Sequence, residues 1–144
     1  MSYYQFVCDL MIGNLDDELL EAVLETIPVE FSVLDAKDEV LAWNRHKTRI
    51  FKRPESVVGR NVRKYHPEKS VDKVEKIISE MKEGKRDKAR FWIDLPLPDF
   101  DEKQKVMIEY YALRNKDGKY IGCLEASQNI TEIQKLSGQK RLLD

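Results

Sequence analysis

The chain has 144 residues, a length that favours one domain with a sizeable buried core. Hydrophobic residues make up 42% and charged residues 35%, which is the composition of a globular protein and not of a disordered one. Its 25 Lys and Arg residues nearly balance 26 Asp and Glu residues. This balance gives no electrostatic footprint for nucleic acid, and we expect no nucleic-acid partner.

Cysteine usage and hydropathy point to a reduced compartment. Cys8 and Cys123 are far apart and form no CxxC pair, so no zinc or redox motif is visible. Residues 1–13 lack the basic start of a secretory signal and include Asp9. No apolar run approaches the roughly 18 residues that a membrane span needs. The sequence therefore predicts a cytoplasmic protein with no membrane partner.

The first predicted helix covers residues 14–27. Its apolar residues recur at helical spacing, Asn14 is the predicted cap, and Pro28 ends the helix. The apolar stripe consists of Leu15, Leu19, Leu20, Val23, Leu24 and Ile27. This stripe is wide enough that part of it, together with residues 3–12, is predicted to pair with a second copy. We therefore expect a homodimer through the N-terminal segment.

The next predicted elements are a hairpin and several helices. Residues 29–35 and 40–44 read as two strands separated by a polar turn. Residues 45–53 and 54–59 are predicted to form two short helices, each bounded by a proline or a glycine. Residues 67–83 form the clearest helix of the chain, because their apolar residues share one face, and Gly84 is the predicted residue that ends it.

The last third of the chain is predicted to be mostly β. In residues 90–95 the apolar side chains of Phe91, Ile93 and Leu95 alternate with Arg90, Trp92 and Asp94. Residues 106–114 and 119–128 read as two strands joined by a turn at 115–118, where a glycine can take a positive φ. Residues 130–137 are predicted to form a short closing helix with the preceding asparagine as its cap.

The order of elements predicts the fold class. Strands at both ends with helices between them favour an α+β domain with a single antiparallel sheet of about five strands and helices on one face. The space between sheet and helices is then the natural ligand cavity. We divide the chain into an N-terminal extension at 1–14, a domain at 15–136 and an exit segment at 137–144.

Several local strings resemble a PAS domain. Asp35 ends the first predicted strand and Asn44 follows the second, as in that family, although Glu39 stands where glycine is common. Residues 54–62 (PESVVGRNV) and 112–133 (ALRNKDGKYIGCLEASQNITEI) also resemble PAS segments. Together these strings extend the resemblance from about residue 15 to about residue 136. The family implies the α+β fold described above and a sensory or interaction role.

Two further strings narrow the resemblance. Residues 65–71 (YHPEKSV) and 136–144 (LSGQKRLLD) resemble the PAS module that follows hemerythrin-like domains in bacterial and archaeal proteins. That family implies no catalysis of its own. The sequence agrees, since it contains no HExxH, P-loop, GxGxxG or supported Ser-His-Asp pattern. We therefore expect that the chain is not an enzyme.

His66 is the sharpest candidate for a cofactor or metal site. Imidazole suits haem iron, and some haem-binding PAS domains place their histidine near the start of the long helix. The alternative is a helix cap or a solvent-facing residue beside Pro67. The predicted lining of the cavity consists of His66, Trp43, Val74, Ile78, Phe91 and Tyr110. For the apolar members of this set, core packing is the ordinary alternative role.

A covalently linked flavin is excluded by one position. Light-oxygen-voltage PAS domains carry a reactive cysteine directly after Gly-Arg-Asn, whereas here Gly59-Arg60-Asn61 is followed by Val62. Valine cannot act as the nucleophile, so that photochemistry is not expected. The identity of the cofactor stays open, with haem as a candidate.

Two functions follow from these patterns. The first is a sensory module that binds a small molecule or cofactor between helix 67–83 and the sheet and passes the change to a partner or neighbouring domain. The second is a protein-interaction module that binds no ligand and only dimerises.

Overall fold

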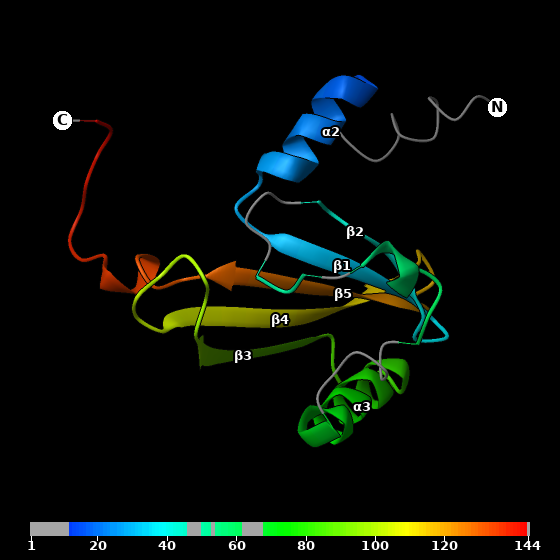
Figure 1. Ribbon diagram of the computed structural model, residues 1–144. Coiled ribbons are helices and arrows are strands. Elements are labelled where there is room, and N and C mark those ends of the chain that lie inside the picture. The colour runs from blue at the N-terminus through cyan, green and yellow to red at the C-terminus, as the bar shows by residue number, and fades with distance from the viewer. Residues whose placement is uncertain (1–11, 46–49, 53, 62–67, 144) are drawn as a thin grey trace.

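A computed structural model describes residues 12–45, 50–52, 54–61 and 68–143 (Figure 1). Five antiparallel strands form one sheet in the order β2-β1-β5-β4-β3, which confirms the predicted α+β fold. In chain order the elements are α2 (Asp17–Thr26), β1 (Glu30–Asp35), β2 (Val40–Trp43), the 3₁₀ turn η1 (Glu55–Val57), α3 (Glu68–Lys82), β3 (Lys88–Leu95), β4 (Gln104–Arg114), β5 (Tyr120–Asn129) and the 3₁₀ turn η3 (Ile133–Lys135).

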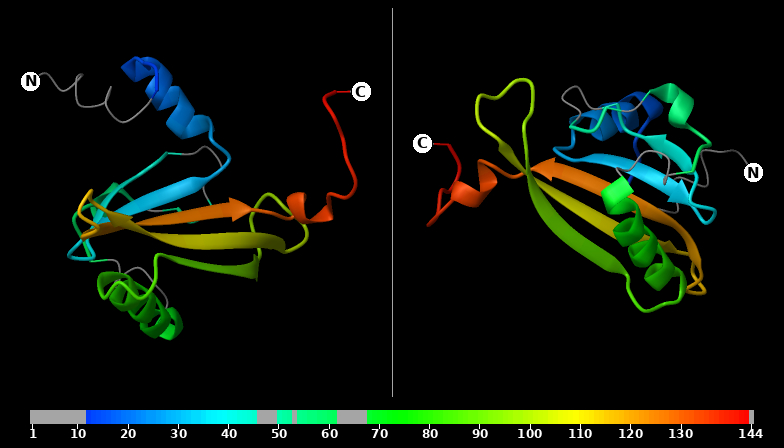
Figure 2. Two further views of the ribbon diagram at one scale, coloured as in Figure 1. Left: turned by 180° about the vertical axis from the view of Figure 1, so that it is seen from behind. Right: turned by 60° about the horizontal axis from the view of Figure 1, so that its bottom comes forward.

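Helix α2 is shorter than predicted and begins at a different cap. The carboxylate of Asp16 accepts a hydrogen bond of 2.8 Å from the backbone N–H of Leu19, so Asp16 is the cap and Asn14 is not. Asp17 and Glu18 in the first turn favour this position because the helix dipole is positive there. No residue of α2 is buried, and the helix stands away from both faces of the sheet (Figures 1 and 2).

The side chain of Asn44 fixes where α2 ends. Its amide nitrogen donates to the carbonyl oxygens of Leu24 at 2.9 Å and Val29 at 3.0 Å, and its amide oxygen accepts from the N–H of Phe31 at 2.8 Å. Asn44 is 4% exposed, so these bonds are largely shielded from water. The asparagine thus joins the last turn of α2 to the start of β1 and the end of β2.

Helix α3 packs against one end of the sheet (Figure 2, right). Val74, Ile78 and Met81 form its buried face, as the helical spacing predicted. Gly84 follows the helix with a φ of 76°, and the Lys85 N–H donates to the carbonyl of Glu80, which is the predicted glycine stop.

Two polar contacts tie the C-terminal end of α3 to the sheet. Lys82 forms an ion pair of 3.0 Å with Asp38, which is buried in the turn between β1 and β2. Arg114 on β4 donates a hydrogen bond of 2.6 Å to the carbonyl oxygen of Met81. This carbonyl belongs to the last turn of α3, where it also accepts a hydrogen bond of 3.2 Å from the backbone N–H of Gly84. The end of α3 is therefore connected to both halves of the sheet.

Three predicted helices are absent or reduced in the described residues. Residues 54–59 contain only the single turn η1, and 130–137 contain only η3. Within 45–53, residues 50–52 are not helical, while 46–49 and 53 lie outside the described residues. The reason is clearest near η1, where Val40 donates to the carbonyl of Arg60 and accepts from Gly59. These sheet-like bonds occupy backbone groups that a helix would use.

The β4–β5 hairpin forms at the predicted turn. Gly118 has a φ of 80°, a value that residues with a Cβ rarely adopt. The side-chain oxygen of Asn115 accepts hydrogen bonds of 3.0 Å from the N–H groups of Asp117 and Lys119. Asparagine at the turn start and glycine at its end therefore fix the register of these two strands.

The described part of the chain contains no helix that is both long enough and apolar enough to cross a bilayer.

A carboxylate on the outer face of the sheet, the face away from α3, collects three donors. Glu109 lies 3.0 Å from Lys88, 2.8 Å from Arg90 and 2.8 Å from the Tyr111 hydroxyl. Burial raises the pKa of Glu109, but the hydrogen bonds from these three side chains outweigh burial and lower its pKa to about 2.

Glu109 should make stability depend on pH in the acid range. Its pKa is lower in the folded chain than in the unfolded one, so the unfolded chain binds the proton first. The contribution is complete above about pH 4.5 and is lost as the pH falls towards 2. We expect Glu109→Gln to lower the free energy of unfolding at pH 7 by about 1 kcal/mol and to change it less at pH 2. Urea denaturation at both pH values measures this, and an equal loss at both would contradict it.

Candidate functional site

Polar side chains are buried on the helix-side face of the sheet, defined as the face that carries Leu34, Tyr110 and Cys123. Burying a polar group without a partner is unfavourable, so a face that serves only for packing is normally apolar. The buried polar residues of this face are Glu30 (5% exposed), Ser32 (2%), Gln104 (6%), Glu125 (7%) and Ser127 (4%).

Two of these five hold other segments of the chain in place. Glu30 accepts hydrogen bonds from the backbone N–H groups of Ile50 and Phe51 at 2.5 and 2.9 Å, and so holds the segment that precedes η1. Gln104 donates to the carbonyl of Glu102 and accepts from Asn129, both at 3.1 Å. Their burial is explained by these bonds within the chain.

The other three form a polar patch, which we define as Ser32, Glu125 and Ser127, and of these Ser32 and Glu125 also have interactions within the chain. Ser32 lies opposite Glu125 across β1 and β5, and Ser127 follows two residues later on the same face. Tyr110 lies opposite Glu125 on the other side, across β4 and β5. The patch therefore sits near the middle of the sheet, next to a large aromatic side chain.

The predicted cavity residues fall into three groups. Phe91 and Tyr110 stack with ring centroids 5.9 Å apart; Tyr110 belongs with Val74 and Ile78 to one core cluster, and Phe91 packs against it. Trp43 is half-buried, packs against the same cluster and also lines a hollow beside β2. His66 lies outside the described residues. So does Val62, which stands where light-oxygen-voltage domains carry the reactive cysteine. Cofactor binding by any of these residues stays a prediction.

No cavity separates the C-terminal half of α3 from the sheet. Met81 and Cys123 are both 0% exposed, and their sulfur atoms lie 4.0 Å apart. Burial, reinforced by the charge of Glu125, raises the pKa of the Cys123 thiol to about 12. Such a thiol stays protonated and is no nucleophile. A ligand under α3 would therefore have to lie nearer the polar patch.

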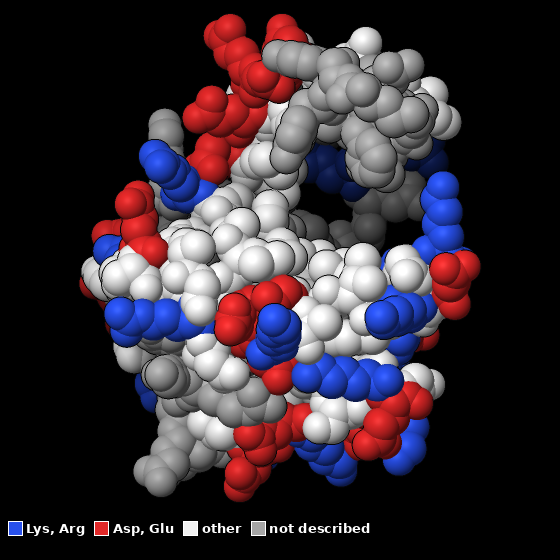
Figure 3. Space-filling model, turned by 90° about the vertical axis from the view of Figure 1, so that its right-hand side faces the viewer, with Lys and Arg blue, Asp and Glu red and all other residues white. Residues whose placement is uncertain are grey.

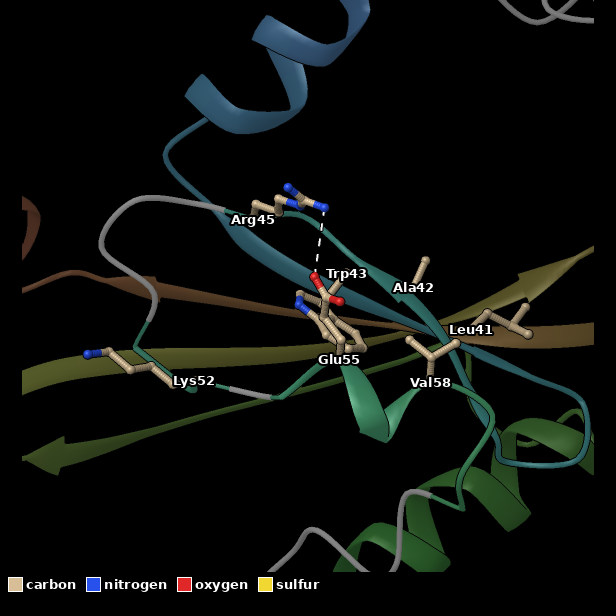
Figure 4. Close-up of a pocket in the computed structure, with 7 residues that line it drawn as sticks. All are labelled: Leu41, Ala42, Trp43, Arg45, Lys52, Glu55 and Val58. Carbon is tan, nitrogen blue, oxygen red and sulfur yellow. Dashed lines mark ion pairs between the residues drawn. The ribbon is translucent and has the colours of Figure 1, made fainter.

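A hollow of about 720 Å³ opens between β2 and η1 (Figure 4). Arg45 and Glu55 form an ion pair of 3.8 Å across it, drawn as a dashed line in Figure 4. The two charged side chains are 83% and 89% exposed, so water screens their attraction. The lining consists of Leu41, Ala42, Trp43, Arg45, Lys52, Glu55 and Val58. Because it is open and its charges are solvated, this hollow is a weaker candidate than the patch.

Metal ligands do not cluster in the described segments: no three His, Cys, Asp or Glu side chains there are placed to hold an ion. The predicted metal ligand, His66, falls outside those segments and stays a prediction.

Sequence reasoning missed the polar patch. The signal was present, since Cys123, Glu125 and Ser127 alternate along β5 and share one face. Sequence alone gave no means of deciding which face that was.

Comparisons with known proteins agree on one family. The model of the PAS domain family matches residues 20–131. A C-terminal domain from Streptococcus mutans is 31% identical, with a TM-score of 0.73 over 88% of this chain and 96% of that one. No protein with a curated description matches the sequence.

Two more distant structures share the fold alone. A PAS domain from Colwellia psychrerythraea is 14% identical, with a TM-score of 0.58 over 80% of this chain and 97% of that one. A sensory box sensor histidine kinase from Vibrio cholerae is 16% identical, with a TM-score of 0.55 over 79% of this chain and 90% of that one. The family match covers most of the chain, and the chain belongs to the PAS domain family, whose members are common in sensory and signalling proteins.

Proposed function

We propose that this PAS domain is a sensory module that binds a small molecule or cofactor between α3 and the sheet, at the polar patch. The observation that carries the proposal is that Ser32, Glu125 and Ser127 are buried together near the middle of the face on which α3 packs. Ligand sites in proteins are mostly apolar with a few polar groups that fix orientation, and this face has that character.

The chemistry of the patch favours a ligand with both a ring and hydrogen-bonding groups. Glu125 offers a carboxylate, and the two serines offer hydroxyl groups that can donate or accept. The Phe91 and Tyr110 rings, stacked 5.9 Å apart, supply flat apolar surface beside Glu125. A planar molecule with polar edges would use both features.

The connections of α3 suggest how binding would be transmitted. Lys82 contacts Asp38 in the β1–β2 turn, and Arg114 holds the carbonyl of Met81. A ligand that favours a slightly different position of α3 would change both contacts. It would thereby shift the equilibrium between arrangements of α3 relative to the sheet. A partner or a neighbouring domain would detect that shift.

The test is native mass spectrometry of the full chain as purified, with Glu125→Gln beside it. The wild type is expected to carry a small molecule or to bind one from a metabolite library. Glu125→Gln should weaken binding about tenfold or more, because a charge-assisted hydrogen bond is lost. Asp94→Asn, on the opposite face of the same sheet, is the matched control and should bind normally. A wild type that binds nothing, or a variant that binds equally well, would refute the proposal.

The haem candidate is tested on the same preparation. Reconstitution with hemin should give a sharp Soret band that changes in His66→Ala if His66 is the iron ligand. Absence of the band removes haem from the candidates and leaves the polar patch for another ligand. An unchanged band in the variant removes His66 as the iron ligand.

A second function, a ligand-free module that dimerises, is favoured by the exposed apolar stripe of α2. We also propose, on the family resemblance, that the domain works in the cytoplasm without catalysis of its own and beside a hemerythrin-like domain. Mass spectrometry separates the two functions, because only the sensory one requires a bound ligand.

A further inference from the structure

Strand β3 leaves one edge of the sheet open. It is the last strand in the order β2-β1-β5-β4-β3, and its eight residues pair with β4 on one side without a bulge. The carbonyl oxygen of Asp87 accepts a hydrogen bond from Ala112 of β4, so the backbone groups of every second residue from Asp87 onward face β4. The residues between them point their N–H and C=O groups away from the sheet, and none of these groups has a backbone partner within the described part of the chain. We call them the open-edge residues: Lys88, Arg90, Trp92 and Asp94.

The opposite edge of the sheet is partly covered. Val40 of β2 donates to the carbonyl of Arg60 and accepts from Gly59, and a further bridge lies beside them. Edge strands are templates for pairing with another strand, and proteins usually shorten, bend or cover them. β3 is neither short nor covered, since no described helix or strand lies along its outer edge (Figure 2, right). The edge of β3 therefore has the form of a docking site for an extended segment.

Two apolar side chains of β3 flank the open edge. Trp92 is 62% exposed and Ile93 is 38% exposed, and as neighbours in a strand they lie on opposite faces of the sheet. A strand added beside β3 would bury part of both side chains through cross-strand contacts. Tryptophan is also among the residues most enriched where proteins bind one another. The open edge thus offers apolar contacts on both faces as well as backbone groups.

Charge at the open edge favours an acidic strand as the occupant. Lys88 and Arg90 share the single carboxylate of Glu109. Further along the strand, Asp94 is paired with Lys105. Three cations therefore face two carboxylates, and a strand with acidic residues opposite Lys88 and Arg90 would neutralise the excess. A second copy of β3 would instead bring the same excess again, so charge opposes pairing of β3 with itself.

The acidic helix of the same chain does not supply this strand. Acidic groups gather over α2, at the top of the molecule in Figure 3. They belong to Asp16, Asp17, Glu18, Glu21 and Glu25. Helix α2 leads into β1 and lies on the side of β1 and β2, whereas β3 forms the opposite edge of the sheet (Figure 1). An acidic strand at β3 is therefore expected from another protein.

We propose that the open edge of β3 binds an extended, acidic segment of a partner protein, which adds a strand antiparallel to β3. Acidic residues of the segment lie opposite Lys88 and Arg90, and a β-branched residue lies opposite Trp92. The polar patch is on β1 and β5, and β4 separates it from β3. The inference therefore goes beyond ligand binding and can fail without affecting it.

Fluorescence anisotropy of a labelled, end-blocked peptide, KVTVEVE, with the full chain tests the docking. Paired antiparallel to β3, the peptide places its lysine opposite Asp94 and its threonine opposite Trp92. Its two glutamates then lie opposite Arg90 and Lys88. The chain is expected to bind this peptide at least tenfold more tightly than the charge-reversed peptide EVTVKVK. Failure to bind KVTVEVE, or equal binding of the two peptides, would overturn the proposal.

Substitutions in β3 separate the charges from the backbone. Lys88→Glu should weaken binding of KVTVEVE at least tenfold, whereas Lys37→Glu, the same charge change in the exposed β1–β2 turn, should leave it unchanged. Trp92→Pro removes an N–H that faces the open edge and that the pairing with β4 does not use. It should abolish binding while circular dichroism shows a folded sheet, and Trp92→Ala, which keeps the N–H, should lose less. Binding that survives both Lys88→Glu and Trp92→Pro would contradict docking at this edge.

Amide hydrogen exchange measured by NMR locates the added strand. In the free chain the amides of the open-edge residues should exchange much faster than those of the residues between them, which are bonded to β4. Saturating KVTVEVE should slow exchange of the open-edge amides at least tenfold and leave the alternate amides nearly unchanged. Protection confined to other strands would overturn the proposal. So would a dimer in light scattering that dissociates in Trp92→Pro, because it would assign the edge to a second copy.

Discussion

Gly122→Ala is expected to lower the free energy of unfolding by about 3 kcal/mol or more, because no side chain fits at this position. A Cβ atom there would overlap the carbonyl oxygen of Leu34 in β1. The overlapped atom belongs to the backbone of a paired strand, so it cannot move aside without disturbing the register of β1 and β5. Urea denaturation followed by circular dichroism measures the loss.

Gly84→Ala is the control for this substitution. Gly84 has a φ of 76°, which an alanine adopts at a cost of roughly 1 kcal/mol, but nothing lies near its Cβ position. Gly84→Ala therefore measures the free-energy cost of a positive φ for alanine without any steric overlap. If Gly122→Ala were no more destabilising than Gly84→Ala, the close approach of the two strands would be contradicted.

Asn44→Ala is expected to lower the free energy of unfolding by about 2–3 kcal/mol. The substitution leaves the carbonyls of Leu24 and Val29 and the N–H of Phe31 without their buried partner, at roughly 1 kcal/mol each. It also releases α2 from its fixed position, so protease cleavage at residues 27–29 should accelerate.

A conservative variant separates the bonds of Asn44. Asn44→Asp keeps the oxygen that accepts from Phe31 but loses the nitrogen that donates to the two carbonyls, so an intermediate loss is expected. Asn115→Ala, in the exposed β4–β5 turn, controls for the general loss of an asparagine and should cost about 1 kcal/mol. If Asn44→Ala were as mild as Asn115→Ala, the anchoring role of Asn44 would be wrong.

The parts of the fold that depend on local chemistry could be predicted from the sequence. Gly84 and Gly118 were located correctly, since a positive φ at a helix end or hairpin turn is a property of a few neighbouring residues. The buried face of α3 followed from spacing alone. The helix predicted at 54–59 failed because its backbone pairs with Val40, a contact between distant parts of the chain that no local pattern reveals.

The candidate site was harder to predict because strand alternation changes phase within β5. Tyr120, Gly122 and Cys123 are all buried, so the regular alternation is interrupted just after the hairpin. If the alternation were regular from the buried Tyr120, odd-numbered residues of β5 such as Glu125 would lie on the outer face. The structure places Glu125 on the helix-side face. Trp43 was predicted to line the cavity because it is aromatic. It instead lines the hollow beside β2, because β2, which ends at Trp43, is an edge strand of the sheet.

The position of β1 in the sheet has a consequence for how the chain is made. Glu30 of β1 pairs with Ser127 of β5. During synthesis β1 therefore cannot complete its pairing until β5 has been made. Until then β1 and β2 form a two-stranded hairpin with one unsatisfied edge, a species that is marginal in water and prone to aggregate. Completion of the domain is thus expected only after synthesis has passed β5, at a rate limited by this long-range closure.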